Sequence, residues 1–229
     1  HRNGNGHVYS SRYISDDQAC DTLLSNLDTK PLGDPKLIKF TTGRRRKQWY
    51  KNVVAVGLSS GFLEPLESTS IHLIQSAIVR LIQLFPHNGF APSLETEYNK
   101  QSELEFEQIR DFLVLHYTVN ERTDSAFFND MRNITLPDSL AHKIALFKES
   151  GNLLREQNDL FLESSWLQVL YGQGITPKDY HGLVDSVPEV QLNQMLTRLL
   201  EIKKEPIAKL PTHDEYIKGM VAKYKRAMS

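Results

Sequence analysis

Two glutamates, Glu64 and Glu67, lie in a segment of small residues between an apolar run and an amphipathic stretch. The run Val53–Val56 predicts a strand buried on both faces, and Gly57 ends it. A carboxylate in such a loop can serve as a general base if it is partly buried. It can also be only a helix-capping residue stabilised by the helix dipole.

The residues after these glutamates predict the start of a helix. Ser68 or Thr69 can cap a helix whose apolar positions recur with helical period as far as Pro86. A strand, a tight loop and a helix N-terminus together bring backbone N–H groups towards an anion or a cofactor. The segment therefore predicts a binding loop as well as a candidate base.

Five segments of the chain resemble sequence blocks of one enzyme family. The block from Gly57 to Ile71 reads GLSSGFLEPLESTSI, and it is accompanied by GNGHVYSS at 4–11, GRRRKQW at 43–49, RDFLVLHY at 110–117 and SWLQVLYGQG at 165–174. In content and order these blocks are similar to those of the flavin-dependent tryptophan halogenases. The resemblance extends over nearly all of the chain.

The resemblance implies an oxidoreductase that uses FAD, as FADH2, with oxygen and a chloride or bromide ion. Hypohalous acid then halogenates an indole or tryptophan-like aromatic, and a flavin reductase supplies the reduced flavin. The implied site residues are Glu67 for catalysis, Thr69 and Ser70 for halide, Gly57, Leu58, Ser59, Ser60 and Pro65 for the cofactor, and Phe161 and Trp166 for the substrate.

Three further family motifs are not found in this sequence: the G-x-G-x-x-G dinucleotide fingerprint, the catalytic lysine and the W-x-W-x-I-P motif. The glycines Gly4 and Gly6 do not make the fingerprint, because no buried strand precedes them. We therefore expect the C-terminal part of a halogenase, inactive by itself.

The substrate and two other functions stay open. Leu160-Phe161 and Trp166-Leu167 stand where members that act on free tryptophan carry a Phe-Trp and a Tyr-Tyr pair. A smaller indole or a larger peptide-borne or scaffold-bound aromatic is therefore an alternative to free tryptophan. A non-halogenating flavin-dependent monooxygenase of the same superfamily, or a binding domain without activity, are the rival functions.

Composition predicts no nucleic-acid or membrane partner. The formal net charge is −1, and no apolar run reaches the length of about 20 residues that a membrane helix needs. The basic run Arg44–Lys47 is interpreted as a solvated strand edge or turn. With Cys20 as the only cysteine, the sequence fits a reducing cytoplasm. The oligomeric state is left open, with a homodimer as one option.

His72 and His116 lie on apolar helix faces and are interpreted as satisfied core histidines, and no metal site is predicted.

The expected fold is α+β, with short strands that complete a flavin-monooxygenase-like FAD/NAD(P)-binding fold and a mostly helical region on the substrate side. We place the boundary between the sheet region 1–70 and the helical region 71–229. Strands are predicted near 8–14, 37–42 and 49–56, and an apolar stretch of uncertain type over 166–171. Helices are predicted over 16–27, 71–84, 95–117, 140–147, 190–199 and 213–228.

Overall fold

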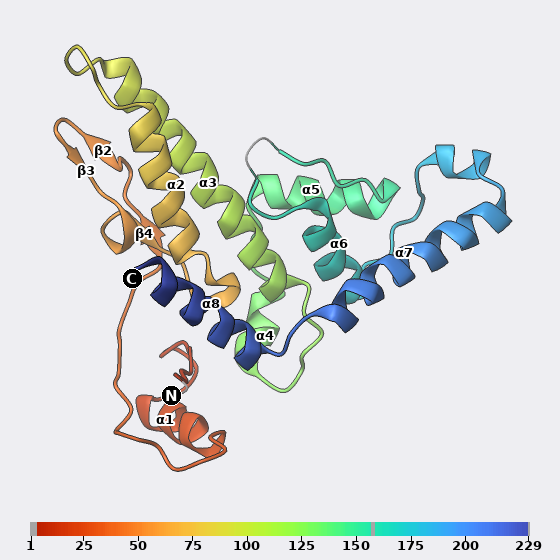
Figure 1. Cartoon of the computed structure of the whole chain (residues 1–229), viewed down its shortest axis with the longest axis horizontal. Coiled ribbons are helices and arrows are strands. Elements are labelled where there is room, and N and C mark those ends of the chain that lie inside the picture. Colours follow the sequence, from red (N-terminus) through yellow and green to blue (C-terminus); the bar gives the residue numbers. More distant parts are fainter. Residues whose placement is uncertain (1–3, 157–158, 229) are drawn as a thin grey trace. The chain divides into compact units, whose positions relative to one another are not determined.

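The computed structural model describes residues 4–156 and 159–228 and is mainly helical (Figure 1). The chain divides into two units, residues 1–179 and 180–229. The first unit holds all four short strands and helices α1 to α6. The boundary predicted after residue 70, between a sheet region and a helical region, stays a prediction.

The strands form two small antiparallel sheets in the first unit. Strand β1 (Gly43–Arg44) pairs with β4 (Gly61–Phe62), and β2 (Trp49–Tyr50) pairs with β3 (Val53–Val54). A strand over Val53–Val56 buried on both faces was a wrong prediction. In the structure β3 has only β2 as a partner, and the Val53 side chain is 63% exposed.

Two other predicted strands, near 8–14 and 37–42, are also absent from the structure. Residues 11–14 form a turn, and residues 37–42 have no regular structure. Both segments are rich in β-branched and aromatic residues, but strand preference depends on cross-strand packing. Neither segment has a partner strand among the described residues, so composition alone does not make a strand.

Helix α1 (Asp16–Ser25) begins where the sequence predicts. The Ser15 side chain accepts a hydrogen bond from the Gln18 amide, and the Gln18 side chain accepts one from the Ser15 amide. This reciprocal capping box satisfies two of the amides that a helix start leaves unpaired. Cys20 on this helix is partly buried.

Helices α2 (Ser70–Gln83) and α3 (Pro92–Thr118) lie side by side (Figure 1). Both match the predicted helical periods. A buried ion pair joins them, because Arg80 of α2 donates to Glu105 of α3 at 2.8 Å and to Ser102 Oγ at 2.7 Å. The other carboxylate oxygen of Glu105 faces His72 Nε2 at 3.1 Å.

The basic run that includes β1 is an exposed strand edge and turn, as the sequence interpretation has it, because residues 45–47 are all exposed. Arg44 forms ion pairs with Glu103 and Glu107 of α3, and Lys47 pairs with Glu95 at 3.2 Å. These contacts attach the small sheets to the acidic N-terminal half of α3.

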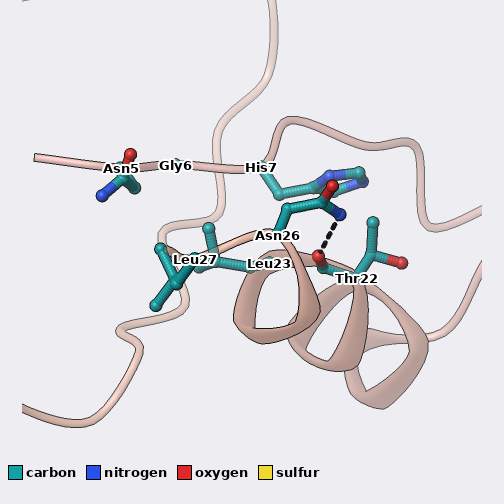
Figure 2. Close-up of a pocket in the computed structure, with 7 residues that line it drawn as sticks. All are labelled: Asn5, Gly6, His7, Thr22, Leu23, Asn26 and Leu27. Atoms are coloured by element: carbon teal, nitrogen blue, oxygen red, sulfur yellow. Dashed lines mark hydrogen bonds between the residues drawn. The ribbon is translucent and has the colours of Figure 1, made fainter. Parts of the chain in front are cut away.

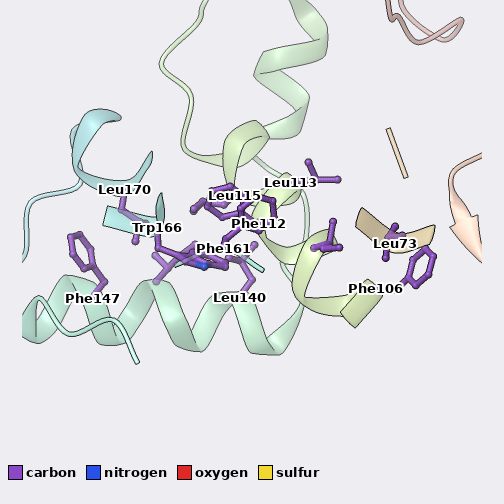
Figure 3. Close-up of a cluster of buried hydrophobic side chains, with 12 residues drawn as sticks. Leu73, Phe106, Phe112, Leu113, Leu115, Leu140, Phe147, Phe161, Trp166 and Leu170 are labelled. Atoms are coloured by element: carbon purple, nitrogen blue, oxygen red, sulfur yellow. The ribbon is translucent and has the colours of Figure 1, made fainter. Parts of the chain in front are cut away.

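The core lies between α3, α5 (Asp138–Ser150) and α6 (Glu163–Gly172). Figure 3 shows Phe112, Phe161 and Trp166 gathered at its centre with Leu115 and Leu140. The apolar stretch of uncertain type is therefore helical. Gly151 closes α5 with a left-handed φ of 69° that glycine adopts without strain. The sequence analysis did not identify the short helix α4 (Ala126–Met131).

The second unit contains a 3-10 turn (Gly182–Ser186), α7 (Glu189–Lys209) and α8 (His213–Ala227). Both helices were predicted, although α7 continues through Pro206. Neither helix contains a buried residue. None of the helices among residues 4–156 and 159–228 has both the length and the apolar character that crossing a bilayer requires.

Candidate functional site

The loop that carries the predicted cofactor residues begins with a tight 3-10 turn, Gly57–Ser59. Gly57 has a φ of 68°, and a Cβ at this position would lie 3.3 Å from the Ile74 side chain of α2. The turn is closed by Ser60, whose amide and hydroxyl both donate to the Gly57 carbonyl, at 2.9 Å and 2.7 Å. Glycine is therefore required here for both its backbone conformation and its small size.

The basic run fixes the same turn from the other side. Arg45 Nε donates to the Ser59 carbonyl at 2.6 Å, and the Arg45 amide donates to the Ser60 carbonyl at 2.8 Å. Ser60 is buried, whereas Leu58 is 75% exposed and Pro65 is also exposed. Among the predicted cofactor residues, Gly57 to Ser60 thus form one hydrogen-bonded turn, and the Leu58 and Pro65 side chains are exposed.

Glu67 and Ser68 are in the left-handed region, with φ values of 65° and 51°, although neither is a glycine. Such a conformation costs about 1–3 kcal/mol per residue and is found preferentially at functional sites. Thr69 then returns to right-handed geometry at φ −76° and ψ −9°, and Ser70 is the first residue of α2. A left-handed residue followed by a right-handed one turns successive amides towards a common point, which favours anion binding.

Thr69 occupies the predicted cap position, but its side chain makes no capping hydrogen bond. The first amides of a helix have no partner inside that helix. Thr69 as a whole is 3% exposed. The structure thus brings Glu67 together with the two predicted halide residues, Thr69 and Ser70.

His116 of α3 faces the Glu67 carboxylate, with 3.1 Å between Nε2 and Oε1. Its other ring nitrogen, Nδ1, lies 2.8 Å from the Phe112 carbonyl oxygen. From the sequence, His116 is interpreted as a satisfied core histidine with no connection to Glu67. The helical periodicity around His116 does not link it to Glu67. Its place in the RDFLVLHY block is the sequence feature that could have indicated a role at the site.

The neighbouring residue of α3 holds the other loop glutamate. The Tyr117 hydroxyl donates to Glu64 Oε2 at 2.6 Å. Burial first, and then the hydrogen bond to Glu64, raise the pKa of Tyr117 well above its ordinary value. Glu64 Oε1 is buried without a hydrogen-bond partner among the described residues. Two adjacent side chains of α3 therefore hold both loop carboxylates.

The predicted substrate residues are not on the surface of this loop. Phe161 is 9% exposed and Trp166 is 3% exposed. Phe161 stacks on Phe112 with 3.9 Å between ring centroids, and Trp166 packs edge-on against Phe112 at 4.9 Å. A substrate contact from either ring remains a prediction, and the burial of both rings argues against it.

An open pocket of ≈ 170 Å³ lies elsewhere, between the N-terminal segment and α1 (Figure 2). His7 lies across Asn26, whose side chain donates to the Thr22 carbonyl at 2.8 Å. None of the predicted site residues lines this pocket. Among the described residues there is no group of three or more His, Cys, Asp or Glu side chains arranged to hold a metal ion.

Comparison with known proteins identifies the family. The sequence profile named tryptophan halogenase matches residues 1–189. The chain is 44% identical to Xcc4156, a flavin-dependent halogenase from Xanthomonas campestris, over 92% of this chain and 42% of that one, with a TM-score of 0.87. It is 42% identical to BrvH, a flavin-dependent halogenase from Brevundimonas sp. BAL3, over 92% and 43% of the two chains, with a TM-score of 0.85.

Among curated relatives, the tryptophan 6-halogenase SttH from Streptomyces toxytricini is 32% identical over 96% of this chain and 43% of its own length. The chain thus spans less than half the length of the relatives it matches. The sequence match covers residues 1–189, including the loop from Gly57 to Ser70, and the structural similarity covers 92% of the chain. The chain belongs to the tryptophan halogenase family.

Proposed function

We propose that this chain forms the halide- and base-bearing part of a flavin-dependent halogenase that acts on an indole or tryptophan-like aromatic. One observation carries the proposal. Glu67 is held in a left-handed backbone directly before α2, where the amides of Thr69 and Ser70 begin the helix. The left-handed backbone of this glutamate is costly, and packing alone does not require it.

The backbone around Thr69 fits a halide ion. Anions are favoured at helix N-termini because the amides there are unpaired and the helix dipole is positive. The family resemblance implies glycine or another small residue after Thr69, and the serine side chain fits here because Ser70 is helical and has no positive φ. Thr69 and Ser70 would therefore hold chloride or bromide through backbone N–H groups.

The turn at Gly57 fits close approach by a flavin. Gly57 has a left-handed backbone and no side chain. Hydrogen bonds to the carbonyl oxygens of Gly57 and Ser59 hold the turn rigid. Gly57 to Ser60 and Pro65 would hold the cofactor. When bound, reduced FAD together with oxygen supplies the oxidising power that converts a halide ion into hypohalous acid.

The role of Glu67 follows from the chemistry of aromatic substitution. When an electrophilic halogen bonds to a ring carbon, that carbon must lose its proton, and the C–H electron pair returns to the ring. Because Oε1 of Glu67 faces His116, Oε2 is the atom that can take this proton. A positioned general base of this kind contributes roughly 10²–10⁴-fold to a rate.

The remaining catalytic parts would lie in a region that corresponds to the part of the relatives outside the match with this chain. These parts are the dinucleotide fingerprint and the catalytic lysine of the family. A flavin reductase is the proposed source of reduced flavin. The similarity to SttH, a tryptophan 6-halogenase, supports an indole-type substrate.

The test uses the complete product of the gene that encodes this chain, with a flavin reductase, FAD, oxygen and bromide. We expect L-tryptophan, indole or a tryptophan-containing peptide to gain one bromine, seen as the paired isotope pattern in mass spectra. Hydroxylated product with no brominated product would instead support the monooxygenase alternative. A protein that binds FAD and modifies no aromatic in the panel would overturn the proposal.

A further inference from the structure

We propose that Tyr117 is a positioning residue, which holds Glu67 in place through its hydrogen bond to Glu64. The catalytic meaning of this role rests on the proposed function, whereas the anchoring of the loop is a property of the chain itself. Tyr117 lies near the C-terminal end of α3, and both glutamates lie in the loop between β4 and α2.

The hydrogen bond between Tyr117 and Glu64 joins two elements that are far apart in the sequence. The Tyr117 hydroxyl donates to Glu64 Oε2 at 2.6 Å, a short distance that is usual when a hydroxyl group donates to a carboxylate. Burial first, and then this bond, raise the pKa of Tyr117 well above its ordinary value, so the hydroxyl keeps its proton at neutral pH. Because Glu64 Oε1 is buried without a partner among the described residues, the Tyr117 hydroxyl is the donor that compensates for the burial of this side chain.

The ring of Tyr117 is itself held in one position by aromatic packing. It stands edge-on to Phe127 of α4, with 5.8 Å between the ring centroids and 90° between the ring planes. Phe127 in turn packs edge-on against Tyr13 at 5.2 Å, and the Tyr13 hydroxyl donates to Asp130 of α4 at 2.8 Å. The hydroxyl that reaches Glu64 is therefore a fixed donor, supported by α3 and α4.

The loop connects Glu64 to Glu67 through a short and constrained path. Pro65 has a φ of −72°, which its ring fixes, and its carbonyl accepts a hydrogen bond from the Ser68 amide at 2.9 Å. Glu67 lies inside this turn with its left-handed φ of 65°. Leu63, on the other side of Glu64, packs against the hydrophobic core. A change in the position of Glu64 therefore changes the position of Glu67.

A purely structural role is the simpler explanation of this bond. In that case Tyr117 would stabilise the fold, and its loss would leave the geometry of Glu67 in the folded protein unchanged. The left-handed backbone of Glu67 and Ser68 favours positioning instead, because non-glycine residues keep such a conformation only where their surroundings hold it. Since a displacement of about 1 Å can lower a rate roughly 10²-fold, an anchor for this loop bears directly on the reaction.

The first experiment measures backbone chemical shifts by NMR on the 229-residue chain, because these shifts report φ and ψ. In Tyr117→Phe, which removes only the hydroxyl, we expect the carbon shifts of Glu67 and Ser68 to move away from left-handed values. Glu64→Gln keeps an oxygen that can accept from Tyr117, so it should leave these shifts nearly as in the wild type. Gly151, which is also left-handed but closes α5, is the internal reference and should not change. Unchanged shifts at Glu67 and Ser68 in Tyr117→Phe would overturn the inference.

The second experiment measures halogenation by the complete gene product. Tyr117→Phe and Glu64→Met both remove the hydrogen bond, so we expect each to lower kcat by about 10²-fold with KM for the aromatic nearly unchanged. The double variant should lose no more than either single variant, because two residues that act only through each other are not additive. Glu64→Gln should recover to within about tenfold of the wild-type kcat. Tyr171→Phe, at an exposed tyrosine, is the control and should match the wild type.

Losses that multiply in the double variant, or a Glu64→Gln variant as slow as Glu64→Met, would contradict positioning through the hydrogen bond. Circular dichroism identifies the folded variants, and if Tyr117→Phe does not fold, Glu64→Gln and Glu64→Met provide the same comparison. If the wild-type protein halogenates nothing, the proposed function fails, yet the shifts of Glu67 and Ser68 still decide whether Tyr117 holds the loop. The two experiments therefore distinguish failure of this inference from failure of the proposed function.

Discussion

At the scale of single residues, adjacent side chains of α3 hold the two loop glutamates by different means. His116 Nε2 lies 3.1 Å from Glu67 Oε1, and Tyr117 donates its hydroxyl proton to Glu64. Non-glycine residues in left-handed conformations, such as Glu67 and Ser68, persist only where their surroundings determine them. The contact with His116 is one of the interactions that surround Glu67.

Tyr117→Phe should destabilise the chain by about 1–3 kcal/mol, because it leaves a buried glutamate oxygen without its donor. Urea unfolding at neutral pH measures this loss. Tyr171→Phe, at a tyrosine that is 62% exposed, is the matched control and should change the unfolding free energy by no more than about 0.5 kcal/mol. A similar effect in both variants would contradict the Tyr117–Glu64 bond.

The same bond has a predictable pH dependence. The pKa of Tyr117 is raised in the folded state, mainly by burial. Its contribution to stability is therefore fully present below the ordinary tyrosine pKa of about 10 and is lost as the pH rises through the raised value. The difference in stability between wild type and Tyr117→Phe should shrink in that alkaline range.

At the scale of elements, the position of the site depends on how α2 is attached to α3. The N-terminus of α2 carries the halide residues, and the C-terminal end of α3 carries the residues that hold the glutamates. The buried contact of Arg80 with Glu105 and Ser102 joins these helices further along. An ion pair of this kind is costly to break, because one charge is left buried.

Arg80→Met should lower the unfolding free energy by about 3 kcal/mol, near the lower end of the range for broken buried pairs, because His72 still faces Glu105. Arg44→Met is the matched control, since its glutamate partners on α3 are 52% and 43% exposed. That control should cost less than about 1 kcal/mol. Equal losses would show that Arg80 does not clamp α2 to α3.

The sequence predicts helices correctly where apolar residues repeat with helical period over many positions. It does not predict short strands and short helices correctly. Helices α2, α3 and α5 repeat apolar residues over many positions, so the period is unambiguous. The Val53–Val56 run suggested a buried strand, but strand burial depends on partners that a local pattern does not specify. Helix α4 was missed because its six residues are too few to show a period.

The site was predictable in part, for a similar reason. The loop motif and the family resemblance point to Glu67, Thr69 and Ser70, which are near neighbours in the sequence, so their roles stay predictions. The contact between Glu67 and His116 depends on tertiary packing, because it forms only when α3 packs with its His116 side towards the loop. No spacing rule within one helix or loop can indicate such a pair.

At the scale of the whole molecule, the first unit contains both the aromatic core and the loop, while α7 and α8 in the second unit bury no side chain. The chain covers 42% of Xcc4156 and 43% of BrvH. The account therefore predicts that the chain carries the base and the halide amides, with the rest of the machinery supplied elsewhere.

The most direct test of this account is Glu67→Gln in the complete gene product, measured for both FAD binding and bromination. Glutamine keeps the size of the side chain and removes its capacity as a base. We expect FAD affinity to stay within about twofold and bromination to fall by roughly 10²-fold or more, as for loss of a general base. Bromination at the wild-type rate with normal FAD binding would contradict the central claim that Glu67 takes part in the reaction.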